Sequence, residues 1–460
     1  MRGSSRAEEL IDPVEQERKL LGLSDGTPVR SARPPGEWTF LSKLAVALAI
    51  TLVLAYLVMW VAAVQSNGGP EGYVRVTDFI STLTGGQIIR NGDAQALYDP
   101  NVQRAAQLEV LSPYRTLLPG QILPYNHLPF EALFVAPFMA LPLPLVFATW
   151  TLLMGVVIGL SLGALDGALS VSRRVGWVMS MAACSYMPLI RSLMLGQNSA
   201  LVLLGLCGTY VALKRDKPNW ASASLLLVAL KPQVLPAVLL LLILQKEWRT
   251  ILGFVGLLSA LSVAAMSLLG VGWPVQYARL LLNVGGWSDK NAIDPGIMHN
   301  WRGFATDLLG AFPSLQTPLY IALSLLSLGV IAWAWSHSWR GTQPIAGTKS
   351  RDWSLLWALT AIVAILTSLH LNPHDLTLAI FPAWIIAMHA MSPSTSITRR
   401  LMWLSLLWTA YAFFPLGLAL QGSTGNSGLL VIPSVLLMAC TALLLALEIA
   451  RINRPAAAHA

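Results

Sequence analysis

Long runs of apolar residues, separated by short polar segments, recur along most of the chain. Such runs predict membrane helices, because a helix needs about 20 apolar residues to cross a bilayer. With Gly, Pro, Asn, Lys and Arg as boundaries, the pattern predicts about twelve membrane segments and an all-α polytopic membrane protein. The predicted segments are Phe40–Val64, Leu143–Leu165, Gly176–Ile190, Ala200–Leu213, Ala221–Leu230, Val234–Leu244, Ile251–Leu269, Leu319–Trp335, Trp353–Leu369, Leu376–Ala390, Leu401–Leu420 and Leu429–Ile449.

Some apolar segments are too short for a full crossing. The two that flank Lys231 and Pro232 predict a broken or re-entrant hairpin with these residues at its tip. Phe130–Leu141, which runs into a proline-rich segment, predicts a short helix lying in the membrane interface.

Composition supports a membrane protein, since 55% of the 460 residues are hydrophobic and only 11% are charged. Residues 1–39 predict a disordered cytoplasmic tail, residues 40–450 one membrane-embedded domain, and residues 451–460 a second cytoplasmic tail. The first segment is expected to stay as an anchor, because the preceding tail is too long and acidic for a signal peptide.

The net charge of +8 is explained by topology. If the segments alternate in direction, most Lys and Arg residues of the loops fall on the side of the N-terminal tail, which is therefore the cytoplasm. Nothing in this pattern calls for nucleic acid as a partner. Cys184, Cys207 and Cys440 lie in apolar segments without metal-ligand spacing, so we expect no metal site.

Polar residues suited to chemistry gather in the loops predicted on the opposite, extracytoplasmic face. The largest of these loops includes Tyr73–Leu141, where Asp78 follows the first membrane segment closely. A carboxylate near the membrane surface is costly unless it is paired or functional. We expect an external catalytic site from the convergence of Asp78, Lys231, Arg302, His370, His374 and Asp375.

Several short motifs occur in a characteristic order along the chain. They are Asp78-Phe79, Leu97-Tyr98-Asp99, Pro129-Phe130, Gly196-Gln197-Asn198 and Lys231-Pro232, followed by His299-Asn300 and Pro373-His374-Asp375. With these motifs the chain resembles glycosyltransferase family 87, the polyprenol-phosphate-mannose-dependent mannosyltransferases of the GT-C type. It departs from the family's usual Tyr-Pro-Pro at Tyr125-Asn126-His127, which leaves His127 without a family role.

The resemblance implies a GT-C-type helical bundle in the plasma membrane, with long extracytoplasmic loops that carry short interfacial helices. It implies transfer of a hexose, with mannose the family's sugar, from a polyprenyl-phosphate donor to a hydroxyl of a glycolipid or glycan acceptor. The expected transfer takes place on the extracytoplasmic face and inverts the sugar's configuration. The donor is carried in the lipid bilayer, so no nucleotide-binding domain and no cofactor are expected.

Each expected site residue has a role in this reaction. The catalytic residues are Asp78, as general base, and His374, which orients the acceptor or shares a proton. Lys231 and Arg302 are expected to bind the donor phosphate. Substrate binding is assigned to Gln197, Asn198, His127, His299 and Tyr98.

Structural roles are alternatives for most of these residues. Asp78 suits the N-cap of a helix that starts at Phe79, Asn198 suits the N-cap of the segment near Ala200, and Asp375 suits a cap as well. Lys231 fits a lysine that snorkels to the membrane surface, and Arg302 a solvated loop charge. Tyr98 and Asp99 suit a turn. For the whole chain, the alternatives are a transporter or flippase of lipid-linked glycan intermediates, and a membrane protein without chemistry.

Overall fold

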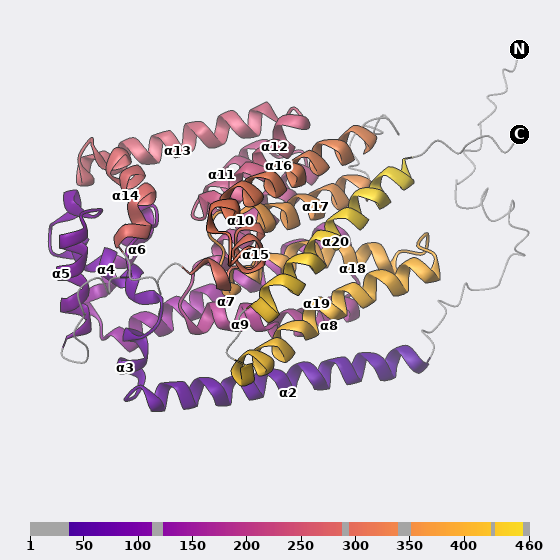
Figure 1. Ribbon diagram of the computed structural model, residues 1–460, viewed down its shortest axis with the longest axis horizontal. Helices are drawn as coiled ribbons and strands as arrows, with labels where there is room; N and C mark the ends of the chain where they lie inside the picture. Colours follow the sequence, from indigo (N-terminus) through magenta and orange to yellow (C-terminus); the bar gives the residue numbers. More distant parts are fainter. Residues whose placement is uncertain (1–35, 113–122, 288–293, 339–350, 425–427, 454–460) are drawn as a thin grey trace, which may run out of the picture. The chain divides into compact units, whose positions relative to one another are not determined.

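The computed structural model describes residues 36–112, 123–287, 294–338, 351–424 and 428–453, in which all regular structure is helical (Figure 1). The predicted all-α fold class is therefore confirmed. The chain divides into two units, Met1–Ala47 and Leu48–Ala460. Of the first unit only the beginning of helix α2 (Gly36–Ser66) is described. Residues 1–35 and 454–460 of the predicted tails lie outside the described residues.

Six helical segments of the described ranges are long and apolar enough to cross a membrane, as expected for a polytopic membrane protein. In α13 (Trp248–Leu269), for example, Leu252 and Val263 are exposed, which suits contact with lipid. The remaining helices are shorter or fall partly outside the described residues, so the number twelve stays a prediction. The six segments are Lys43–Ser66 in α2, Leu143–Leu169 (α7), Trp248–Leu269 (α13), Pro313–Ser338 (α16), Pro373–Met391 (η5 with α18) and Leu430–Ile452 in α20.

The boundaries of two predicted segments are corrected: one segment is interrupted, and the other begins earlier than predicted. Where Gly176–Ile190 was expected, α8 (Arg173–Cys184) ends and α9 (Met187–Met194) begins with Pro188 in its first turn. Proline fits a first helical turn but disfavours a helical residue before it, so a new helix starts here. For the same reason the segment predicted at Leu376–Ala390 begins earlier, as the 3₁₀ helix η5 (Pro373–Ala379), before α18 (Ile380–Met391).

The residues around Lys231 form a hairpin, as the sequence predicts. Helix α11 (Pro218–Val228) leads to the 3₁₀ turn η3 (Pro232–Val234) and helix α12 (Leu235–Leu244). Ser222 of α11 donates from Oγ to the carbonyl of Thr250 in the first turn of α13, the helix that follows α12 (2.9 Å). The chain therefore turns at Lys231, runs back along α12 and returns to α11 at the start of α13.

The long polar loop folds into short helices of its own. They are α3 (Pro70–Arg75), α4 (Phe79–Arg90), η1 (Ala94–Ala96), α5 (Pro100–Leu111), α6 (Pro129–Val135) and η2 (Ala136–Ala140). The helix expected at Phe130–Leu141 is thus present, as α6 and η2. Helix α4 packs against α5, α6 and η2. Buried Gln107 on α5 strengthens this packing, since it donates to Thr84 of α4 (3.1 Å).

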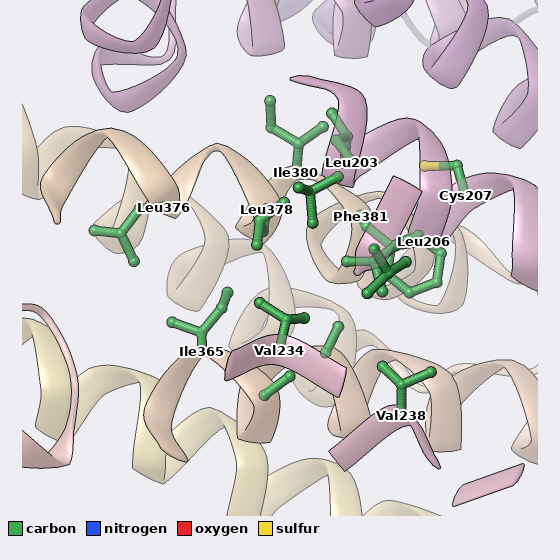
Figure 2. Packing of buried hydrophobic residues seen from close by; sticks show 14 of the residues in the cluster. Leu203, Leu206, Cys207, Val234, Val238, Ile365, Leu376, Leu378, Ile380 and Phe381 are labelled. Carbon is green, nitrogen blue, oxygen red and sulfur yellow. The ribbon is translucent and has the colours of Figure 1, made fainter. Parts of the chain in front are cut away.

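The apolar core joins the helices that carry the site. Helix α10 (Ser199–Lys214) packs against α7, α11 and α18, while α17 (Arg351–Thr367) packs against α12, α16, α18 and α20 (Gly428–Ile452). Figure 2 shows Leu203 and Leu206 of α10 close to Ile380 and Phe381 of α18. The other helices are α14 (Trp273–Trp287), η4 (Pro295–Ile297), α15 (Trp301–Leu308) and α19 (Ile397–Thr424).

The two ends of α10 lie in different surroundings. Its first residue, Ser199, contacts the polar cluster described below. Its last residues include Lys214 and Tyr210, whose hydroxyl pairs with Ser354 at the start of α17 (2.9 Å). A helix of 16 residues separates these ends by roughly 24 Å, close to the thickness of a bilayer core. The polar cluster and the basic Lys214 end therefore suit opposite membrane faces.

This arrangement predicts different labelling at the two ends. In a variant without native cysteines, we expect a cysteine at exposed Asp93, before η1, to react with an impermeant maleimide in intact cells. A cysteine at exposed Asn219, at the start of α11, should react only after the membrane is opened. The opposite labelling pattern would invert the topology.

Candidate functional site

Asp78 lies at the junction of α3 and α4, with its side chain about one-third exposed. It occupies the position before the first residue of α4, but its side chain makes no capping hydrogen bond. The N-cap alternative for Asp78 is therefore wrong. Instead Oδ2 accepts a hydrogen bond from Gln197 Nε2 (2.9 Å), and His374 Nδ1 is 3.9 Å from the same oxygen. Asp78, Gln197 and His374, which the sequence places far apart, are thus neighbours.

The Gly196 turn between α9 and α10 brings Gln197 to Asp78. Gly196 has φ of +69°, and a Cβ at this position would lie 2.6 Å from the Cβ of Phe79, so a side chain is excluded. Two hydrogen bonds fix the turn against its neighbours: Phe79 N donates to the Leu195 carbonyl (3.0 Å), and Trp150 Nε1 donates to the Gly196 carbonyl (2.9 Å). The start of α4 is thereby attached directly to the turn.

Asp375 is a buried carboxylate next to this turn and has three hydrogen-bond partners. Its Oδ1 accepts hydrogen bonds from Ser199 Oγ (2.8 Å) and Lys231 Nζ (2.5 Å). Its Oδ2 accepts from the backbone N–H of Asn372 (3.1 Å), as in a capping box, so the expected capping role of Asp375 is confirmed. Three separate parts of the chain therefore meet at one buried carboxylate.

The position of the Lys231 side chain tests whether this residue snorkels to the membrane surface. Its side chain is 10% exposed and points to Asp375 rather than outward, so the snorkelling interpretation is wrong. An ammonium group has three N–H donors, and one of them is used by Asp375. The pair stands beside His374, whose Nε2 is 3.6 Å from Asp375 Oδ1. The His374 ring therefore lies between Asp375 and Asp78, at distances too long for hydrogen bonds.

His370 and Arg302 complete the polar cluster that the sequence predicts. Burial lowers the pKa of His370 to about 4. The negative charge of Asp375 acts to raise this pKa, whereas Lys231, His374 and Arg302 act to lower it. His370 is therefore uncharged at neutral pH. Arg302, on α15, donates to the carbonyl of Leu369 (3.1 Å) and is partly exposed, so its guanidinium keeps further donors. The solvated-charge alternative for Arg302 stays open.

The expected substrate-binding residues differ in accessibility. Tyr98 is buried, donates to the carbonyl of His127 (3.0 Å) and stacks on Tyr125. His299 is buried against Ser434 (2.5 Å). Burial and the nearby positive charge of Arg191 lower the pKa of His299 to about 4. In this structure Tyr98 and His299 pack against other buried residues, whereas Gln197 reaches Asp78. Substrate binding by Tyr98, His299 and Gln197 stays a prediction.

Asn198 does not cap α10, which corrects another structural alternative. Its side chain makes no capping hydrogen bond, and its Nδ2 donates to Glu131 Oε2 (2.8 Å). The same oxygen lies 2.9 Å from His127 Nδ1, and Thr82 Oγ1 donates to Oε1 (2.7 Å). His127 and Asn198 thus share a buried carboxylate that the sequence interpretation missed.

Glu131, Arg191 and Ser199 are among the residues of this region that sequence reasoning did not single out. The two charged ones carry a signal, because each lies in or beside an apolar segment, where a charge is expected to have a partner or a function. Ser199 carries no such signal. Among the described residues no cluster of His, Cys, Asp or Glu suits a metal ion.

Comparison with known proteins identifies the family. The family model described as glycosyltransferase family 87 matches residues 125–361, a little over half of the chain. No curated protein and no solved structure shows a significant match. The matched range includes Glu131, Gln197, Lys231 and Arg302, while Asp78 precedes it and the residues around His374 follow it.

The buried pair makes a prediction about stability. Asp375→Asn leaves the Lys231 ammonium buried without its counter-charge, so we expect the free energy of unfolding to fall by about 3–5 kcal/mol. Combining it with Lys231→Met removes both charges and should restore part of the loss. SDS-induced unfolding in mixed micelles measures both variants.

A matched control is Glu71→Gln, which breaks the pair between Arg75 and a half-exposed Glu71. Arg75 is buried but keeps its hydrogen bonds to the carbonyls of Val110 and Glu71, so the expected loss is smaller than in Asp375→Asn, about 1–2 kcal/mol. Unfolding of Asp375→Asn at the same SDS concentration as the parent would contradict a stabilising role for the pair.

Proposed function

Because the chain belongs to glycosyltransferase family 87, we propose that it transfers a hexose, with mannose the first candidate, from a polyprenyl-phosphate donor to an acceptor hydroxyl. The acceptor is a glycolipid or glycan at the extracytoplasmic face of the plasma membrane. One observation carries the proposal: a partly exposed carboxylate, Asp78, lies beside a cluster that contains two cationic side chains, Lys231 and Arg302.

Asp78 is the proposed general base. Its Oδ2 is oriented by Gln197, and its Oδ1 accepts no hydrogen bond from any described residue. In the reaction the acceptor O–H bond breaks and its proton passes to this carboxylate, while the acceptor oxygen bonds to the anomeric carbon. Attack from the side opposite the phosphate inverts the configuration at that carbon.

The leaving group explains the need for cations. As the bond between the anomeric carbon and the phosphate oxygen breaks, its electron pair stays on the lipid phosphate and adds negative charge there. Lys231 has two N–H donors beyond the one held by Asp375, and Arg302 has donors beyond the one used by Leu369. Arg191 is a further cation near this region, since its charge acts on His374.

His374 is the proposed link between the base and the cations. Its two ring nitrogens face Asp78 and Asp375 at 3.9 and 3.6 Å. A small movement on substrate binding would bring Nδ1 within hydrogen-bond reach of Asp78 or of an acceptor hydroxyl. His374 would then hold the acceptor in line with the base.

The location of the cluster supports a lipid-borne donor. His374 and Asp375 are at the start of Pro373–Met391, one of the segments long enough to cross a membrane, so the cluster lies where such a helix ends. The phosphate of a polyprenyl lipid lies at the same depth, at the boundary of the hydrocarbon region. The basic residues at the far end of α10 support the extracytoplasmic assignment.

The donor class is directly testable. Purified protein in lipid nanodiscs should form labelled product from radiolabelled polyprenyl-phosphate mannose and a total lipid extract. The product should carry the inverted anomeric configuration, since a single displacement is expected. Under the same conditions a nucleotide sugar should give no product. Robust transfer from a nucleotide sugar in the absence of polyprenyl phosphate would overturn the proposal.

A further inference from the structure

The carboxylate of Glu131 is buried in α6 beside the proposed site, yet no step of the proposed reaction uses it. Burial alone would raise its pKa, but the charge of His127 and hydrogen bonds from His127, Thr82 and Asn198 lower the pKa of Glu131 to about 2. The group is therefore ionised at neutral pH. Since a buried charge is retained only where its partners compensate it, the three partners are held firmly around it.

The partners come from three separate segments that surround Asp78. Thr82 lies on α4, one turn beyond Asp78, and donates to Oε1 at 2.7 Å. Asn198 directly follows Gln197, and its Nδ2 donates to Oε2 at 2.8 Å. His127 belongs to the segment before α6. Glu131 thus joins α4, the helix that directly follows Asp78, to the turn that carries Gln197 to Asp78.

The hydrogen bond to Glu131 determines the conformation of the Asn198 side chain. Asn198 stands in the N-cap position of α10, where its side chain would ordinarily accept a backbone hydrogen bond, but it makes no such bond. Its buried Oδ1 has no hydrogen-bond partner among the described residues, while Nδ2 points to Glu131. The interaction with the carboxylate therefore prevails over capping.

We propose that Glu131 is a positioning residue: through Asn198 and the adjoining Gln197 it holds the amide of Gln197 against Asp78 and so sets the direction of the Asp78 carboxylate. Glu131 itself touches no reacting atom. The inference rests on the proposed function of Asp78 as general base. It extends that proposal to a second carboxylate, which acts only through the first.

The experiment compares Glu131→Gln with Asn198→Ala, which interrupts the same connection at a second point and carries the test if Glu131→Gln does not fold. Because a misdirected base slows the chemical step, both variants should lower kcat by roughly 10- to 100-fold. The KM for polyprenyl-phosphate mannose should change by less than about twofold, since donor binding is untouched.

Gln107→Met is the matched control. Gln107 is also buried and also reaches α4, through Thr84, but among the described residues its side-chain hydrogen bonds go to Thr84 and Leu123 and not to the Gly196 turn. The Gln107→Met substitution should lower the melting temperature, while kcat should stay near that of the parent. An equal fall of kcat in Gln107→Met would show that loosening α4 alone explains the loss, and would overturn the positioning role.

A double-variant cycle tests the connection through Gln197. In a Gln197→Ala background, Glu131→Gln should reduce kcat little further, because the contact that it supports has already gone. Losses that multiply would overturn the proposal, as would a parental kcat in both Glu131→Gln and Asn198→Ala.

Asp78→Asn, assayed alongside, separates this inference from the proposed function. If Asp78→Asn keeps the parental rate, the base assignment fails, and the inference fails with it. If Asp78→Asn is inactive while Glu131→Gln and Asn198→Ala keep the parental kcat, only the role of Glu131 fails.

Discussion

The buried ion pair between Lys231 and Asp375 constrains the whole site. Removing two charges from water is costly, and their attraction offsets that cost only when the remaining hydrogen-bond partners are supplied. Here Ser199 and the backbone of Asn372 supply them, so the hairpin tip, the start of α10 and the start of η5 must meet. Gln197 and His374 are near neighbours in sequence of Ser199 and Asp375. The same constraint therefore brings both of them to Asp78.

Within the site, the Asp78 carboxylate and the cations Lys231 and Arg302 differ in their surroundings. Asp78 is partly exposed and free of any cationic partner within hydrogen-bond distance among the described residues, which suits a carboxylate that takes a proton. Lys231 is paired with Asp375 beyond the His374 ring, and Arg302 acts on the nearby His370, so a lipid phosphate would meet both cations in this cluster. Because a segment long enough to cross a membrane begins at this cluster, the proposed chemistry would take place at a membrane surface. The geometry thus supports a transferase that takes its donor from the bilayer.

Much of the fold and part of the site could be predicted from the sequence, because membrane helices and the residues that interrupt them leave clear local patterns. The hairpin at Lys231 and the helix at Phe130–Leu141 followed from segment length and proline positions, and the convergence of Asp78 with His374 followed from topology and family resemblance. Side-chain partners could not be predicted in this way. Asp78 and Asn198 stand in N-cap positions without capping, since Gln197 and Glu131 compete for their side chains across 119 and 67 residues of chain. The break at Pro188 was missed because apolar length alone ignores the effect of a proline on the residue before it.

The central claim is that Asp78 takes the acceptor proton, and single-turnover transfer by Asp78→Asn tests it most directly. The protein is loaded with polyprenyl-phosphate mannose, donor affinity is measured, and acceptor is then added. The account predicts a transfer rate lower by roughly 10²- to 10⁴-fold, because a general base acts in the transition state. Donor affinity should stay within about twofold of the parent. A variant that keeps most of its transfer rate, or that loses donor affinity as severely as rate, would contradict the account.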